Sequence, residues 1–185
     1  MAKRTLQRKR KMKRRATRRR KIRQRGGADL LNNTGAPPAT GSNDFNVKFQ
    51  PNSSLSASVN GNSMGIMEST PQPYTTWSPP QPGSFNTVIC WDPDATKSPD
   101  PNQGFAHWIV TNCTGKDTDS GNEILDWTAP NPPKETGEHR YIFGLFSQTG
   151  KLETTAPDRN NFNIESFVKG NNLTALAYKG IRVKA

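Results

Sequence analysis

The chain has 185 residues, a formal net charge of +11 and only 31% hydrophobic residues. This length fits a single domain with a tail, and no apolar run approaches the ~20 residues that a membrane helix needs. The basic N-terminus lacks the apolar stretch of a secretory signal, so we expect the two cysteines to be reduced thiols rather than a disulfide.

Residues 1–25 form a polybasic segment that holds 15 of the 26 Lys and Arg residues and no acid. Residues 26–185 retain 11 basic and all 15 acidic side chains, a net charge of −4. The repulsion between like charges predicts a disordered tail that binds phosphates by releasing counterions. We expect it to bind nucleic acid or another anionic surface through Lys9, Arg10, Lys11, Lys13, Arg14, Arg15, Arg18, Arg19, Arg20 and Lys21.

The tail carries no aromatic residue among its basic ones, which predicts binding without base stacking or sequence readout. An anionic membrane is the competing surface. The run also fits a nuclear localisation signal, so we expect an intracellular protein, cytoplasmic or nuclear. Arg-rich extensions of this kind also resemble proteins packed with DNA in large viruses, which makes packaging in a virion a further expectation.

A flexible linker is predicted at residues 26–42 and a folded domain at residues 43–185. Residues 45–49 alternate apolar and polar side chains and predict a strand. The proline-rich residues 71–80 favour an edge strand flanked by loops, because proline cannot donate to a ladder.

Three apolar runs predict buried strands at residues 88–91, 108–110 and 141–146. Near the C-terminus, Asn163 can cap a short helix and residues 173–178 form the last strand. Strands at short spacing with one brief helix predict a mainly antiparallel β-domain.

Ionisable residues adjoin each of the three buried strands, where a β-scaffold usually presents a ligand site. Asp92, Asp94, His107 and His139 are four candidate ligands, and Tyr141 shares a strand face with His139. A histidine held by a carboxylate donates to phosphate or carboxylate oxygens, so the set suits a small anion. The residues alone leave open a purely structural role, since Asp-Pro is a common turn and a lone His is usually structural.

Two His and one Asp could also form an open metal site, but the helical His spacings of metallohydrolases are missing. Cys90 lies in the middle of a predicted strand, and Ser147 has no identified base. We therefore expect neither a catalytic residue nor a metal or other cofactor.

Three segments together resemble the phosphatidylethanolamine-binding protein family, which includes Raf kinase inhibitor proteins and plant flowering regulators. They read Val-Ile-Cys-Trp-Asp-Pro-Asp-Ala at 88–95, His-Trp-Ile-Val-Thr-Asn at 107–112 and Pro-Pro-Lys-Glu-Thr-Gly-Glu-His-Arg-Tyr at 132–141. The resemblance covers about residues 44–185 and implies that family's β-sandwich-like fold.

The resemblance also implies that Asp92, His107, His139 and Tyr141 line a pocket for phosphorylated head groups, with Pro93 and Asp94 shaping the loop. Thr96 stands where the family usually has a second proline. Gln103 is nearest to a tyrosine that the family places beside the pocket. Ala129-Pro130-Asn131 replaces a glycine loop. The chain also ends where some members add a helix beside the pocket, which implies a more open mouth.

The sequence therefore predicts a non-enzymatic module that binds a small phosphorylated or anionic ligand and is tethered by its basic tail. The alternative is a nucleic-acid packaging or tethering protein whose pocket is vestigial. A protein partner is not predicted from the sequence.

Overall fold

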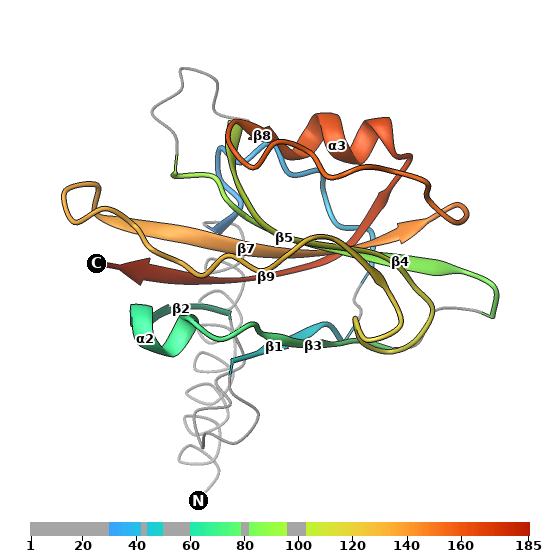
Figure 1. Cartoon of the computed structure of the whole chain (residues 1–185), viewed down its shortest axis with the longest axis horizontal. Coiled ribbons are helices and arrows are strands. Elements are labelled where there is room, and N and C mark those ends of the chain that lie inside the picture. The colour runs from blue at the N-terminus through green and yellow to red at the C-terminus, as the bar shows by residue number, and fades with distance from the viewer. Residues whose placement is uncertain (1–29, 42–43, 50–59, 79–81, 96–102) are drawn as a thin grey trace, which may run out of the picture.

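A computed structural model describes residues 30–41, 44–49, 60–78, 82–95 and 103–185. The basic tail predicted at residues 1–25 lies outside these ranges, and so does Thr96, which stands where the family usually has a second proline. In the part that is described, one large sheet and one small sheet form the body, as Figure 1 shows.

The large sheet is built around three long neighbouring strands, β4, β5 and β7, which pair antiparallel. Its order is β2-β9-β7-β4-β5-β6, and β8 pairs with β5 away from this path. The strands are β2 Asn60–Met64, β4 Phe85–Asp92, β5 Gln103–Cys113, β6 Asn122–Leu125, β7 Glu138–Gln148, β8 Phe162–Asn163 and β9 Thr174–Lys184.

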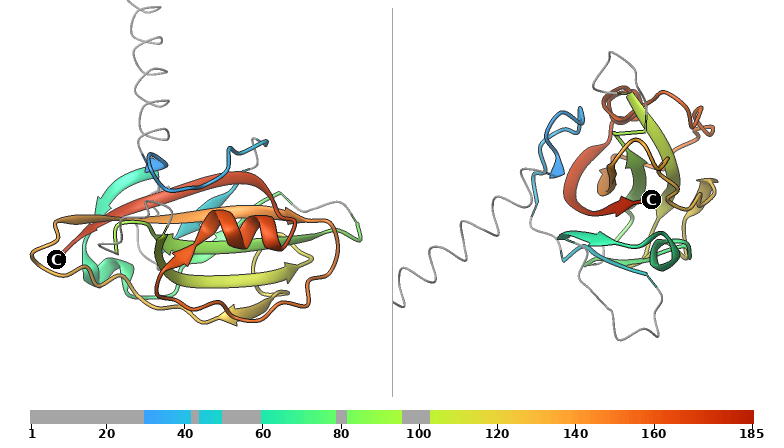
Figure 2. Two further views of the ribbon diagram at one scale, coloured as in Figure 1. Left: turned by 90° about the horizontal axis from the view of Figure 1, so that it is seen from above. Right: turned by 90° about the vertical axis from the view of Figure 1, so that its left-hand side faces the viewer.

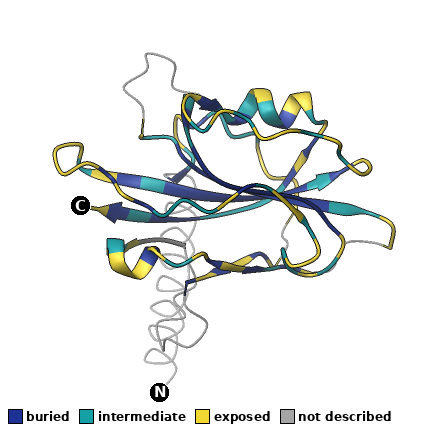
Figure 3. Ribbon diagram, viewed as in Figure 1, coloured by how far each residue is buried: buried dark blue, intermediate teal, exposed yellow. Residues whose placement is uncertain are grey.

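Both faces of this sheet are covered, which explains why its central strands are nearly continuous apolar runs. One face packs on the small sheet of β1 (Asn46–Lys48) and β3 (Tyr74–Thr76). The other face packs on helix α3 (Ile164–Gly170). Figures 1 and 2 show these layers, and in Figure 3 the buried residues concentrate along the long strands.

The mainly β fold predicted from the sequence is confirmed, including the short helix near the C-terminus. The Asn163 side chain accepts a hydrogen bond from the Ser166 backbone N–H at 2.9 Å, which is the expected cap. Two features differ from the prediction. A further helix, α2 (Ile66–Ser69), precedes β3, and β2 pairs parallel with β9, so the large sheet is mixed.

Residues 30–41, which lie in the segment predicted to be a flexible linker, pack along β9. Leu30 is buried in the core beside α3, and its side chain fills the space above Gly180. The Thr40 N–H donates to the Ala175 carbonyl at 2.9 Å, and the Tyr178 hydroxyl donates to the Pro37 carbonyl at 2.8 Å. Burial of the leucine and these hydrogen bonds hold the segment on the sheet.

The cysteines are free and buried, as predicted. Within the described residues, every helix is too short or too polar to cross a bilayer.

Candidate functional site

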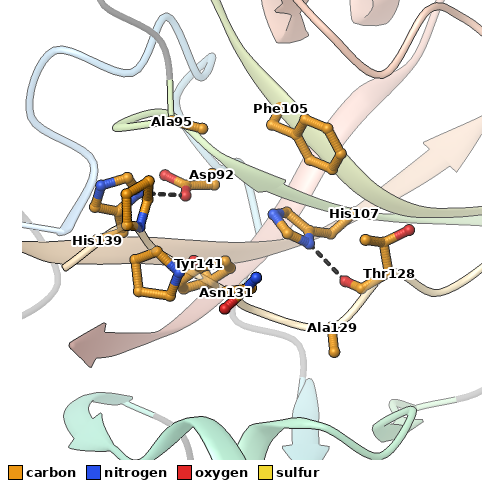
Figure 4. A pocket seen from close by; sticks show the side chains of 11 residues that line it. Asp92, Ala95, Phe105, His107, Thr128, Ala129, Asn131, His139 and Tyr141 are labelled. Atoms are coloured by element: carbon orange, nitrogen blue, oxygen red, sulfur yellow. Dashed lines mark hydrogen bonds and ion pairs between the residues drawn. The ribbon is translucent and has the colours of Figure 1, made fainter. Parts of the chain in front are cut away.

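The predicted site residues Asp92, His107, His139 and Tyr141 meet in one pocket of about 230 Å³. It lies where β4 ends, beside β5 and β7, and a loop after β6 closes one side (Figure 4). Its walls are largely apolar. The full lining is Asp92, Ala95, Phe105, His107, Thr128, Ala129, Asn131, Pro132, Pro133, His139 and Tyr141.

The Asp92 carboxylate is fixed by the turn that follows β4. Its Oδ1 accepts the Asp94 backbone N–H at 2.7 Å across Pro93, which cannot donate and holds the turn. Its Oδ2 accepts from His139 Nδ1, also at 2.7 Å. Gly104 permits β5 to approach this turn, because a Cβ there would lie 2.4 Å from the Asp92 carbonyl oxygen.

His107 reaches the pocket because it is the extra residue of a β-bulge. Cys90 pairs with Trp108, and Trp91 pairs with Ala106, so His107 has no partner on β4. In a continuous register His107 would oppose Trp91, on the face that packs against α3. The bulge instead places it on the pocket face, and its carbonyl accepts the Thr128 N–H at 2.9 Å.

The His107 ring is held in one tautomer. Nδ1 lies 2.6 Å from the Thr128 carbonyl oxygen, which can only accept, so Nδ1 carries a hydrogen. The ring contacts Phe105 and Tyr141 at centroid distances of 4.8 and 4.9 Å. Burial lowers the pKa of His107, against the opposing effects of the Thr128 hydrogen bond and the Asp92 charge. The ring is therefore neutral at pH 7, with a bare Nε2.

His139 is the charged member of the pair. The Thr136 hydroxyl donates to the Pro133 carbonyl at 2.7 Å, so it must accept from His139 Nε2 at 2.8 Å. Nδ1 donates to the Asp92 carboxylate. Both ring nitrogens thus carry hydrogens. The hydrogen bond to Asp92 raises the pKa of His139, against the opposing effect of burial.

Tyr141 stands two residues after His139 on β7 and lines the same pocket. Burial raises the pKa of its phenol, and the charge and hydrogen bonding of Asp92 raise it further. The hydroxyl therefore stays protonated.

Pro93 and Asp94 are not among the pocket-lining residues. The Asp94 carboxylate accepts from Arg140 three times, from the backbone N–H at 2.9 Å, Nε at 2.8 Å and Nη2 at 2.6 Å. Although burial raises the pKa of Asp94, these hydrogen bonds hold it below its ordinary value. Arg140 Nη1 also donates to the carbonyls of Leu30 and Asn32. Asp94 thus links the pocket turn to the N-terminal segment.

Gln103, the residue nearest in sequence to the missing tyrosine, pairs with Asn163 of β8 and does not line the pocket. Phe105 supplies the aromatic wall instead. In the loop that lacks a glycine, Ala129 and Asn131 both line the pocket, and the Asn131 amide points inward in Figure 4. Sequence reasoning assigned no role to Phe105. The alternation of side chains along β5, two residues before His107, was the available signal.

The arrangement suits binding better than nucleophilic catalysis. Cys90 is fully buried, and burial raises its pKa well above the ordinary value, which keeps the thiol inert. Among the residues that the structure describes, no three His, Cys, Asp or Glu side chains converge to hold a metal ion. The Asp92 and His139 charges cancel, as do those of Asp94 and Arg140, so the pocket has little net charge.

Comparisons with known proteins agree with this fold. Residues 45–181 match the family model described as phosphatidylethanolamine-binding protein. Similar solved structures include a carboxypeptidase Y inhibitor complexed with its cognate proteinase, 22% identical over 78% of this chain and 84% of that chain, with a TM-score of 0.66.

Two phosphatidylethanolamine-binding proteins from Plasmodium species are also similar. The one from Plasmodium vivax is 17% identical over 84% of this chain and 92% of that chain, with a TM-score of 0.65. The one from Plasmodium falciparum is 18% identical over 80% of this chain and 88% of that chain, with a TM-score of 0.62. At these identities the solved structures show the fold alone.

Proposed function

The chain belongs to the phosphatidylethanolamine-binding protein family, and we propose that it binds a small anion, a phosphate or phosphorylated head group, without turning it over. Family membership supports a ligand-binding or inhibitor module. The observation that carries the choice of ligand is the convergence of Asp92, His107, His139 and Tyr141, from three strands, in one pocket.

The pocket offers an anion few but well-placed partners. The His139 imidazolium neutralises the Asp92 carboxylate, which would otherwise repel an anion, and the Asn131 amide faces the interior (Figure 4). Apolar walls from Phe105, Pro132 and Pro133 exclude water and strengthen those interactions. The small volume favours a head group over a large ligand.

Calorimetry with phosphorylethanolamine tests this proposal on the full-length protein and two variants. We expect His139→Ala to weaken binding more than His107→Ala, because it leaves the buried Asp92 carboxylate unpaired and facing the anion. The loss for His139→Ala should be about 1.5–3 kcal/mol, in the range expected when a buried polar group is left without its partner. Wild-type protein that gives no binding heat at millimolar ligand would contradict the proposal, and equal losses would contradict the ranking.

The second part of the proposal concerns residues 1–25, as a tail that tethers the domain at 43–185 to nucleic acid or another anionic surface. Its support is the charge distribution, since 15 basic residues stand against a body of net charge −4. Binding by charge alone gives a slope of about −0.9 in log K against log salt for each phosphate contacted. Six to ten contacts would cost roughly a thousand-fold or more in affinity between 50 and 200 mM salt.

Fluorescence anisotropy across a salt series tests the tail with duplex DNA. The matched variant is full-length protein in which the ten basic residues between positions 9 and 21 are glutamine. We expect this variant to lose DNA binding while it keeps phosphorylethanolamine binding. Retained DNA binding would move the contact to the folded body. A cellular function that survives pocket variants but not the tail variant would favour the packaging alternative, in which the pocket is vestigial.

A further inference from the structure

The hydrogen-bonding capacity of the pocket is asymmetric. His139 gives both of its ring hydrogens to protein groups, Asp92 and Thr136, and His107 gives its Nδ1 hydrogen to the Thr128 carbonyl. The described residues offer no hydrogen-bond partner to His107 Nε2, although the side chain is only 5% exposed and lines the pocket. In Figure 4 this nitrogen lies on the ring edge away from Thr128, facing the interior.

A neutral histidine whose Nδ1 carries the hydrogen presents Nε2 as an acceptor. The other tautomer would leave the Thr128 carbonyl facing a bare nitrogen at 2.6 Å. Hence the pocket contains an acceptor at the position where an anion needs a donor. A hydrogen must therefore come either from the ligand itself or from protonation of His107.

We propose that the pocket selects phosphomonoesters over phosphodiesters, because a phosphomonoester monoanion carries the P–OH hydrogen that His107 Nε2 accepts. This inference rests on the proposed anion-binding function and narrows its ligand class. One hydrogen is shared between the phosphate oxygen and Nε2, no covalent bond changes, and the ligand carries a single negative charge. A phosphodiester has no such hydrogen, so its binding requires His107 to take up a proton from the solvent.

The charges around His107 favour this assignment. Asp92 and His139 face the ring across the pocket as a pair of opposite charge, and the neutral Tyr141 phenol contacts the ring. Arg159 Nη1 donates to the His107 carbonyl at 3.3 Å, and its positive charge opposes protonation of the ring. Burial acts in the same direction. A neutral pocket also binds a monoanion at lower desolvation cost than a dianion.

Proton counting by calorimetry separates the two ligand classes. The probes are phosphorylethanolamine, a monoester, and glycerophosphorylethanolamine, a diester, each titrated into full-length protein in buffers of different ionisation enthalpy. The second pKa of a phosphomonoester is about 6, so at pH 5.5 roughly 0.8 of the monoester already carries the shared proton. We expect diester binding to take up about 0.8 proton more than monoester binding at pH 5.5, and this difference to vanish at pH 7.5.

The His107→Gln variant is the matched control, because an amide cannot take up a proton. It should abolish the proton uptake that accompanies the diester, and circular dichroism checks that it folds; if it does not, the wild-type comparison alone decides. Equal proton uptake by both ligands at pH 5.5 would overturn the selection of monoesters and leave anion binding intact. If neither the monoester nor the diester binds, the proposed function is overturned, together with the inference that rests on it.

Discussion

The buried Asp92–His139 ion pair should make a large contribution to stability, which can be measured with variants. Both side chains are at most 4% exposed, and their atoms lie 2.7 Å apart. Replacing His139 with glutamine leaves a buried carboxylate without its cation, which should cost about 3–5 kcal/mol. This is a large part of the 5–15 kcal/mol typical of a domain. In the double variant Asp92→Asn/His139→Gln the buried charge is gone, so we expect a coupling energy of about 1–3 kcal/mol.

The pair also predicts how stability depends on pH. Because the folded pKa of His139 is raised by Asp92, its contribution is complete below the ordinary value of about 6.5 and is lost as the pH rises through the folded pKa. The wild type should therefore lose this stability as the pH rises above about 6.5, and His139→Gln should not. His107 affects stability in the opposite direction. Because its folded pKa is lowered, its protonation destabilises the wild type as the pH falls, and His107→Gln should remove this loss.

Urea denaturation at pH 6 and pH 9 measures the free energy of unfolding for the wild type, Asp92→Asn, His139→Gln and the double variant. These values give the coupling energy and its dependence on pH. Additive single-variant losses, or a cost below about 1 kcal/mol for His139→Gln, would refute the buried ion pair.

Two further predictions concern packing. Leu30→Ala should destabilise the fold by about 2–3 kcal/mol in urea denaturation, because the buried side chain pins the N-terminal segment, whereas half-buried Leu31→Ala should cost less than about 1 kcal/mol. Equal small losses would mean that the segment adds nothing to stability. Gly104→Ala should cost about 1–3 kcal/mol and weaken phosphorylethanolamine binding, because its Cβ would collide with the Asp92 carbonyl oxygen. Gly150→Ala, which meets no atom within 4 Å, should stay within about 0.5 kcal/mol, and the same effect at both glycines would contradict the close approach.

The sequence predicted the central strands because both faces of the sheet are buried, which makes β4, β5 and β7 nearly continuous apolar runs. The Asn163 cap was readable because capping is local. The parallel pairing of β2 with β9 was not, since it joins polar residues 60–64 to a strand more than a hundred residues away. Pairing at that separation leaves no local pattern.

The site was predicted as a set of residues but not as a hydrogen-bonding system. Asp92, His107, His139 and Tyr141 were expected together, and they line one pocket. His107 is neutral and His139 is protonated, because of the hydrogen bonds that Thr128, Asp92 and Thr136 make to the two rings. The two threonines are ordinary loop residues that carry no sequence signal. The bulge at His107 also leaves no signal in the sequence, because it depends on the register between β4 and β5. The packing of residues 30–41 was not predicted, because two leucines in a polar stretch do not indicate which surface of the fold they contact.

The central claim, a phosphate-binding pocket between two histidines, is tested most directly by the imidazole NMR signals of the full-length protein. The chain has only two histidines, His107 and His139, so each resonance can be assigned with a single variant. During titration with phosphorylethanolamine we expect both to shift saturably with one dissociation constant. His107 should move further, because its Nε2 is the atom that faces the ligand. Unchanged resonances of both histidines at millimolar ligand would contradict the claim.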